Sequence, residues 1–167
     1  TLALLQGDNE HRYIVADLTN KNDVEQLVQK MPTLNGVVHA AGIVKPFPTQ
    51  FIDYQHINEV FAINYNAVLV LTARLLRKRK IAKGGSLVML SSVSSQHPYK
   101  GGALYTSSKA ALEAYCRSLA LEQASKKIRV NCVAPALVKT GIFEQTKAAA
   151  NEQQINEYAQ KYPLGFG

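Results

Sequence analysis

The stretch Ser86-Leu-Val-Met-Leu-Ser-Ser92 decides the fold, because an apolar run of four residues stops abruptly at two serines. Such a run is typical of a buried strand in a parallel sheet, and the polar loop after it marks the strand's carboxyl end. The same pattern recurs along the chain. We expect further strands at 11–16, 34–40 and 128–133, and helices at about 20–31, 55–80 and 103–125. Strands that alternate with helices predict βαβ units, and right-handed crossovers predict a doubly wound parallel α/β sheet with helices on both faces.

The length and composition are those of one globular domain. The chain has 167 residues, of which 47% are hydrophobic and 19% are charged, and this excludes a disordered chain. No apolar run approaches the roughly 18 residues that span a bilayer, and the start shows no signal-peptide pattern. We therefore expect a cytoplasmic domain with no membrane segment.

The net charge of +7 is concentrated in one run of cations without an acid. The run comprises Arg74, Arg77, Lys78, Arg79, Lys80 and Lys83. It can be interpreted as a nucleic-acid patch or as a solvated helix end, where cations oppose the negative end of the helix dipole. No aromatic residue is interleaved and no nucleic-acid motif surrounds the run, so we favour the helix end and expect no nucleic-acid partner.

Cysteine and histidine spacing gives no metal site. Cys116 and Cys132 lie sixteen residues apart and match no metal or redox motif, and the four histidines are scattered. We expect no metal and two reduced, buried cysteines.

The segment Tyr105-Thr-Ser-Ser-Lys109 carries chemistry, because residues four apart lie on one helix face. A nearby ammonium favours phenolate and lowers a phenol's pKa, which suits proton transfer near neutral pH. Ser92 follows a strand and could hold a substrate oxygen beside the phenol. A hydride partner is then needed that no side chain supplies, and this implies a nicotinamide cofactor. The alternatives are an ordinary surface pair for Tyr105 and Lys109, and a loop cap for Ser92.

On these residues the sequence resembles the classical short-chain dehydrogenase/reductase family. The resemblance is carried by Leu90-Ser-Ser-Val-Ser94, Tyr105-x-x-x-Lys109, Arg129-Val-Asn-Cys-Val-Ala-Pro135 and Asn64 within Phe61-Ala-Ile-Asn-Tyr65, in the family's order. Within the family, the chain looks most like bacterial 3-oxoacyl-[acyl-carrier-protein] reductases. The resemblance implies a Rossmann-like fold.

The resemblance also implies roles for four residues. Tyr105 resembles the catalytic acid/base, and Lys109 the residue that lowers its pKa and binds the nicotinamide ribose. Ser92 resembles the residue that positions the substrate oxygen. Asn64 matches the asparagine of a water-linked proton relay to the lysine, although it could instead be a helix-kink residue.

Cofactor contacts are implied in the same way. Asp17 and Leu18 match the pair that meets the adenine, and the other matching positions are Ala41, Gly42, Tyr105, Lys109, Pro135, Ala136, Val138 and Thr140. Asp17 and Thr140 could each be only a helix cap.

The chain departs from the family pattern in two motifs. The family's Asn-Asn-Ala-Gly reads His39-Ala-Ala-Gly42 here, and His39 could replace an asparagine or simply pack against the sheet. Ala136 stands where the family usually has glycine.

The Gly-rich turn that holds a dinucleotide's pyrophosphate is absent from the sequence. The family's strands 3–6 are represented, whereas its first two strands and its last have no counterpart. We therefore expect residues 1–167 to be one partial NAD(P)-binding domain, with a lid segment at about 141–167. Because two strands lie between family strands 3 and 4, segments 11–16 and 35–40 should lie roughly 14 Å apart. Hydrogen bonds between them would indicate a rearranged sheet.

The expected function is oxidoreduction between NADP(H) or NAD(H) and a ketone or secondary alcohol, with 3-oxoacyl thioester reduction in fatty acid biosynthesis as the specific case. The alternative is a catalytically incompetent fragment that only dimerises. The resemblance implies a homodimer or homotetramer through helices at about 55–80 and 103–125. A nucleic-acid binder is the third hypothesis.

Overall fold

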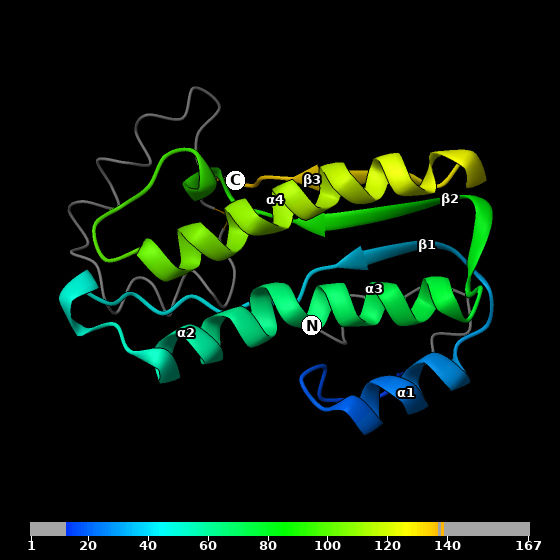
Figure 1. Cartoon of the computed structure of the whole chain (residues 1–167), viewed down its shortest axis with the longest axis horizontal. Coiled ribbons are helices and arrows are strands. Elements are labelled where there is room, and N and C mark those ends of the chain that lie inside the picture. Colours follow the sequence, from blue (N-terminus) through cyan, green and yellow to red (C-terminus); the bar gives the residue numbers. More distant parts are fainter. Residues whose placement is uncertain (1–12, 137, 139–167) are drawn as a thin grey trace.

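The computed structural model describes residues 13–136 and 138, which form a three-stranded parallel sheet with helices packed along it (Figure 1). The elements are α1 (Lys21–Lys30), β1 (Leu34–His39), α2 (Tyr54–Phe61), α3 (Ala67–Arg77), β2 (Ile81–Leu90), α4 (Ala103–Gln123) and β3 (Arg129–Val133). Short 3₁₀ turns lie at Thr49–Phe51, Val93–Ser95 and Ala124–Lys126. Strand and helix alternate as expected, so the α/β class is confirmed.

The sheet has the order β1-β2-β3, and every pair is parallel. Val38 is paired with Val88, and Leu87 with Val130. Consecutive order combined with right-handed crossovers places the connecting helices on the same face. Leu87 and Met89, on that face, are fully buried in a core that includes residues of all three strands and of α1, α3 and α4.

Among the described residues, the helices therefore cover one face of the sheet, and the expectation of helices on both faces is wrong for this part of the chain. Val38 and Val133 point away from this core and remain 64% and 48% exposed.

The strand expected at 11–16 does not form where the structure describes it. Residues 13–16 have no regular structure, and Val15 is fully exposed. An apolar run becomes a strand only when a neighbour satisfies its backbone groups, and β1 pairs with β2 alone. Because residues 13–16 do not pair with β1, the sheet is not rearranged. The expected separation between segments 11–16 and 35–40 cannot be compared with the structure, because residues 13–16 form no strand.

The long helix expected at 55–80 is interrupted. A π-helical turn, Ala62–Asn66, separates α2 from α3. The combined helix Tyr54–Arg77 is long and apolar enough to cross a membrane by length and composition, contrary to the expectation that no segment would be. Its apolar side packs into the core through Val68, Leu71 and Leu75, and this packing accounts for its hydropathy.

Strand β2 begins five residues earlier than expected, and it includes Gly84 and Gly85. Gly84 has a φ of +79°, which favours glycine, and the β1–β2 register shifts beside it, between Leu34 and Gly36. A Cβ at Gly85 would lie 2.9 Å from the Ala82 carbonyl oxygen. The two glycines thus permit an irregular start to the central strand.

The basic run lies at the end of α3, as the helix-end interpretation predicts. Arg74 and Arg77 occupy the last turn of α3, and Arg74 pairs with Glu25 of α1 at 2.8 Å. Lys80 donates to the Met31 carbonyl oxygen. Cations at this helix end face the negative pole of its dipole.

His39, the last residue of β1, is buried inside the fold. Its side chain is 6% exposed, and Nε2 lies 2.9 Å from the hydroxyl of Thr72 on α3, which is fully buried. Of the two alternatives for His39, packing is therefore the one observed. Burial lowers the pKa of His39 from 6.5 to about 4, so the imidazole is neutral at neutral pH.

This histidine should make stability depend on pH. Because its folded pKa lies below the unfolded value, its contribution is present above pH 6.5 and is lost as pH falls towards 4. The expected loss is about 3 kcal/mol in the free energy of unfolding. Urea unfolding at pH 7, 5.5 and 4.5 should show that His39→Gln flattens this slope, whereas His97→Gln at an exposed position preserves it. An unchanged slope in His39→Gln would contradict the assignment.

Candidate functional site

Four of the predicted site residues, Asn64, Ser92, Tyr105 and Lys109, come from segments that meet at the carboxyl edge of the sheet. Ser92 follows β2, and Tyr105 and Lys109 lie in the first turns of α4. Asn64 lies in the π-helical turn, which packs against α4. The carboxyl ends of parallel strands are where open α/β sheets bind ligands.

Asn64 is a fully buried polar residue with three hydrogen bonds. Its Oδ1 accepts from the backbone N–H of Ile43 at 2.8 Å, and its Nδ2 donates to the Ile43 carbonyl at 3.0 Å. Nδ2 also donates to Ser108 Oγ at 3.1 Å, and Ser108 Oγ donates to the Tyr105 carbonyl at 2.7 Å. Asn64 therefore joins the loop after β1 to the helix that carries Tyr105. Asn64 does lie at an irregularity of the helix, as the helix-kink alternative holds, but that alternative does not account for these three hydrogen bonds.

Lys109 is directed at the end of β2. Its side chain is 4% exposed, and Nζ donates to the Leu90 carbonyl at 2.7 Å. Nζ also lies 5.7 Å from the centroid of the Tyr105 ring. Burial lowers the pKa of Lys109, and this effect is partly opposed by the charge of Cys132.

The phenol of Tyr105 behaves differently from the expectation. Burial raises its pKa, and the Ser92 hydroxyl opposes that rise. Lys109 was expected to lower this pKa. In the structure the ammonium is instead hydrogen-bonded to the Leu90 carbonyl and stands over the ring. The chain's own residues therefore hold Tyr105 as a neutral phenol, which is a proton donor at neutral pH.

Ser92 begins the tight turn Val93–Ser95. Its Oγ accepts from the Ser94 N–H at 3.3 Å and from the Ser94 hydroxyl at 2.9 Å. Ser92 therefore caps this turn, which is the loop-cap alternative, and its hydroxyl also lowers the pKa of Tyr105. With both acceptor positions used, the hydroxyl hydrogen of Ser92 is free to donate.

Gly42 brings the backbone of the loop after β1 close to the cluster. A Cβ at this position would lie 3.4 Å from both Asn64 Oδ1 and Lys109 Nζ. A side chain would crowd these two polar atoms, whereas glycine lets another molecule approach them.

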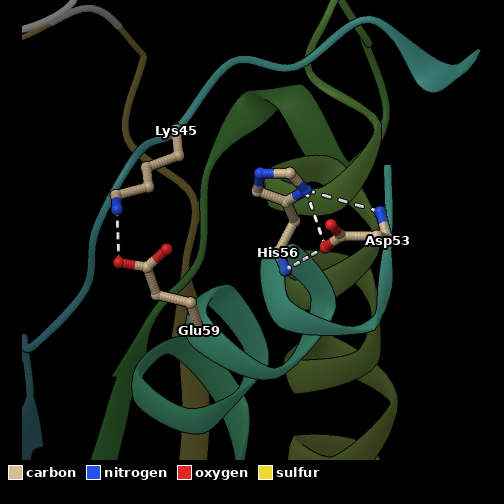
Figure 2. Close-up of polar contacts among 4 residues, drawn as sticks. All are labelled: Lys45, Asp53, His56 and Glu59. Carbon is tan, nitrogen blue, oxygen red and sulfur yellow. Dashed lines mark hydrogen bonds and ion pairs between the residues drawn. The ribbon is translucent and has the colours of Figure 1, made fainter. Parts of the chain in front are cut away.

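The loop that follows Gly42 is fastened to α2 by polar contacts (Figure 2). Lys45 forms an ion pair with Glu59 on α2. Asp53 and His56 form a capping box, in which the His56 N–H donates to Asp53 Oδ1 at 2.9 Å. The backbone hydrogen bond from His56 lowers the pKa of Asp53. These exposed contacts hold the start of α2 in place and contribute little stability each.

The remaining predicted cofactor residues are spread around this cluster. Asp17 lies before α1, where it accepts from Thr19 at 2.7 and 2.8 Å, whereas the N-cap is Asn20 and not Asp17. No described hydrogen bond joins Asp17 to the cluster. Leu18 packs against the core, Ala41, Ala136 and Val138 are exposed, and Pro135 is half-buried. Thr140, like the lid segment 141–167, lies outside the described residues.

Two residues of this edge were missed in the sequence. Ser108 links Asn64 to α4. Glu113 accepts hydrogen bonds from Ser91, which precedes Ser92, and from Ser95, which lies three residues after it. A signal for Glu113 exists, because it lies four residues after Lys109 and hence on the same helix face.

Both cysteines are free, as expected, with Cys116 buried on α4 and Cys132 half-buried on β3. Within residues 13–136 and 138, no group of three or more His, Cys, Asp or Glu side chains is arranged to hold a metal ion.

Comparison with known proteins identifies one family. The family model for short chain dehydrogenases matches residues 2–151. The chain is 31% identical, over 98% of its length, to a protein named 3-oxoacyl-[acyl-carrier-protein] reductase FabG from Rickettsia typhi, of which it covers 67%. It is 33% identical to a benzil reductase ((S)-benzoin forming) from Saccharomyces cerevisiae, over 92% of this chain and 62% of that enzyme.

Solved structures give the same result. A short chain dehydrogenase family protein from Francisella tularensis superposes with a TM-score of 0.80 at 25% identity, over 92% of this chain and 66% of that one. The chain spans about half to two thirds of the length of the relatives it matches.

Removal of the Asn64 amide should loosen this edge of the sheet. Asn64→Ala leaves the Ile43 N–H and Ser108 without their partner and creates a cavity. We expect a loss of about 3 kcal/mol in the free energy of unfolding, measured with urea. Asn66→Ala, an exposed position in the same turn, should change stability by less than about 0.5 kcal/mol. Equal effects of the two substitutions would contradict the role of the buried amide.

Proposed function

Because this chain belongs to the short-chain dehydrogenase family, we propose that the whole protein is an oxidoreductase that moves a hydride between NAD(P)H and a ketone or secondary alcohol. The observation that carries the proposal is the convergence of Asn64, Ser92, Tyr105 and Lys109 at one edge of the sheet. Lys109 of this group lies over the Tyr105 ring, and the Ser92 hydroxyl influences the pKa of the same phenol.

In the reduction direction, Tyr105 donates the proton to the substrate oxygen. Its raised pKa keeps the phenol protonated until negative charge develops on that oxygen. The free hydrogen of Ser92 points the same oxygen at the phenol, because Ser94 supplies the hydrogen bonds that Ser92 accepts. The cation of Lys109 stabilises negative charge on the phenol after transfer.

Gly42 is the proposed point of cofactor approach, because glycine places no side chain against the cluster. This point is bounded by Lys109 Nζ, a donor for sugar hydroxyls, and by Asn64 Oδ1. The exposed residues Ala41, Ala136 and Val138 extend the same edge, and Asp17, Leu18, Pro135 and Thr140 complete the proposed contacts. The nicotinamide cofactor supplies the hydride that no side chain can provide.

The proposed substrate class is a carbonyl compound, with a 3-oxoacyl thioester as the specific case. The name of the Rickettsia typhi relative supports the thioester. The name of the yeast relative supports carbonyl reduction more broadly. We place the protein in the cytoplasm, in keeping with such a role.

Replacing Tyr105 by Phe tests the proposed chemistry. Tyr105→Phe removes the proton donor and keeps the ring, so kcat for carbonyl reduction by the whole protein should fall by about 10²–10⁴-fold. The Kd for NADH or NADPH, from fluorescence titration, should change far less than kcat, since Lys109 and Gly42 are untouched and the ring of residue 105 is kept. Tyr54→Phe, at a position 86% exposed, should leave both quantities unchanged.

Two outcomes would overturn the proposal. Full turnover by Tyr105→Phe would exclude the proton-transfer role. Failure of the wild-type protein to bind either dinucleotide would favour the alternative of a non-catalytic, dimerising domain.

The outer sides of the long helices support the proposed assembly as a homodimer or homotetramer. Ile57 on α2, Val70 on α3 and Leu121 on α4 are 37%, 42% and 81% exposed, although all three are large and apolar. Exposed apolar side chains on these helices could be buried by association with a second copy of the chain.

A charge on this surface should weaken association. Leu121→Glu should raise the dissociation constant, measured by sedimentation, by about 10–100-fold. Gln26→Glu, on an exposed position of α1, serves as the control and should leave it unchanged. If Leu121→Glu associates as the wild type does, the interface lies elsewhere.

A further inference from the structure

Helix α4 presents a third functional side chain in line with Tyr105 and Lys109. Glu113 follows Lys109 by four residues, so all three lie along one side of the helix. Its Oε1 accepts from Ser91 Oγ and from Ser95 Oγ, each at 2.6 Å. Hydrogen bonds from hydroxyls to an ionised carboxylate are short and roughly twice as strong as neutral ones. Glu113 is thus the strongest side-chain anchor of the 91–95 segment.

The two serines are placed so that this anchor controls Ser92. Ser91 precedes Ser92 directly. Ser95 closes the turn, because its N–H donates to the Ser92 carbonyl at 3.0 Å. Each hydroxyl also has a second acceptor, Lys109 O at 3.4 Å for Ser91 and Ser92 O at 2.9 Å for Ser95. The carboxylate is nearer and charged, so it is the favoured partner.

Two backbone hydrogen bonds tie this segment to β3 and to the residues that follow it. The Ser91 N–H donates to the Val133 carbonyl at 2.7 Å, and the Val93 N–H donates to the Pro135 carbonyl at 3.0 Å. They fix the backbone at two points. The side of the turn that faces α4 is held by Glu113.

We propose that Glu113 is a positioning residue, whose carboxylate holds Ser91 and Ser95 so that the Ser92 hydroxyl faces Tyr105. This inference rests on the proposed function, in which Ser92 orients the substrate oxygen. Without the carboxylate, the 4%-exposed Ser91 hydroxyl loses its close partner and the turn shifts. A displacement of about 1 Å in a reacting group can cost about 10²-fold in rate.

The test compares Glu113→Leu, Glu113→Gln and wild type in the whole protein. Glu113→Leu removes both acceptors, and kcat for carbonyl reduction should fall by about 30–100-fold. Glu113→Gln keeps one acceptor oxygen and should recover most of that loss, to within about tenfold of wild type. The Kd for NADPH should stay within about twofold in both variants, because Tyr105, Lys109 and Gly42 are unchanged. Glu122→Leu, at an exposed position of the same helix, is the matched control and should retain wild-type kcat.

A second measurement separates this inference from the proposed function. Hydrogen exchange of the Gln96 and His97 amides, which donate to the Val93 carbonyl at 3.1 and 2.8 Å, reports on the turn without catalysis. It should speed up by about tenfold or more in Glu113→Leu, with the amides of α4 unchanged.

If the wild-type protein turns over no carbonyl substrate, the proposed function is wrong. Faster hydrogen exchange in Glu113→Leu would still support the role of Glu113 in holding the 91–95 segment. Wild-type turnover together with full kcat in Glu113→Leu overturns the inference. So does a Gln variant as slow as the Leu variant, because the hydrogen bonds would then not be the cause.

Discussion

The buried amide of Asn64 is the constraint on which the candidate site depends. A parallel sheet brings the ends of its strands to one edge, but it does not fix the loops that follow them. Asn64 does so by pairing with both backbone groups of Ile43, much as a neighbouring strand would, and by reaching Ser108 on α4. One side chain thereby sets the distance between the Gly42 loop and the helix of Tyr105 and Lys109.

The buried charge of Lys109 is also stabilised by a backbone group. An ammonium that is 4% exposed needs a partner, and the partner is a backbone carbonyl at the end of β2 and not a carboxylate. A carboxylate would neutralise the cation, whereas a carbonyl leaves its positive charge available to the edge of the sheet. The one carboxylate on the same helix side, Glu113, is occupied by two serine hydroxyls instead.

The parts of this site that local spacing determines could be predicted from the sequence. Tyr105 and Lys109 share a helix face because they are four residues apart, and Ser92 lies at the edge because it follows a strand. The partners of Asn64 could not be predicted, since Ile43 and Ser108 lie 21 and 44 residues away from it. The predicted direction of the Tyr105 pKa shift was wrong, because burial depends on the whole fold and residue spacing indicates only the nearby Lys109 cation.

In the fold, too, features set by local sequence could be predicted, and features that depend on distant partners could not. The bounds of β3 and α4 were predicted closely. The strand at 11–16 was not, because strand formation needs a pairing partner that the pattern itself does not contain. The π-helical turn left a trace that could have been used: Val60, Asn64, Val68 and Thr72 are all buried at strict four-residue intervals. In a straight α-helix such positions drift by about 40° at each step, so a wider turn is needed to keep them in line.

That wider turn makes the length of the helix as important as its composition. Loss of one residue within Ala62–Asn66 would tighten the turn into an ordinary α-helix without breaking it. The helix on one side would then rotate by about 100° relative to the other. Either Asn64 would leave Ile43, or Leu71 and Leu75 would leave the core. An insertion or deletion in this segment therefore changes which residues of a whole helix face the site or the core, whereas a substitution changes the contacts of one side chain only.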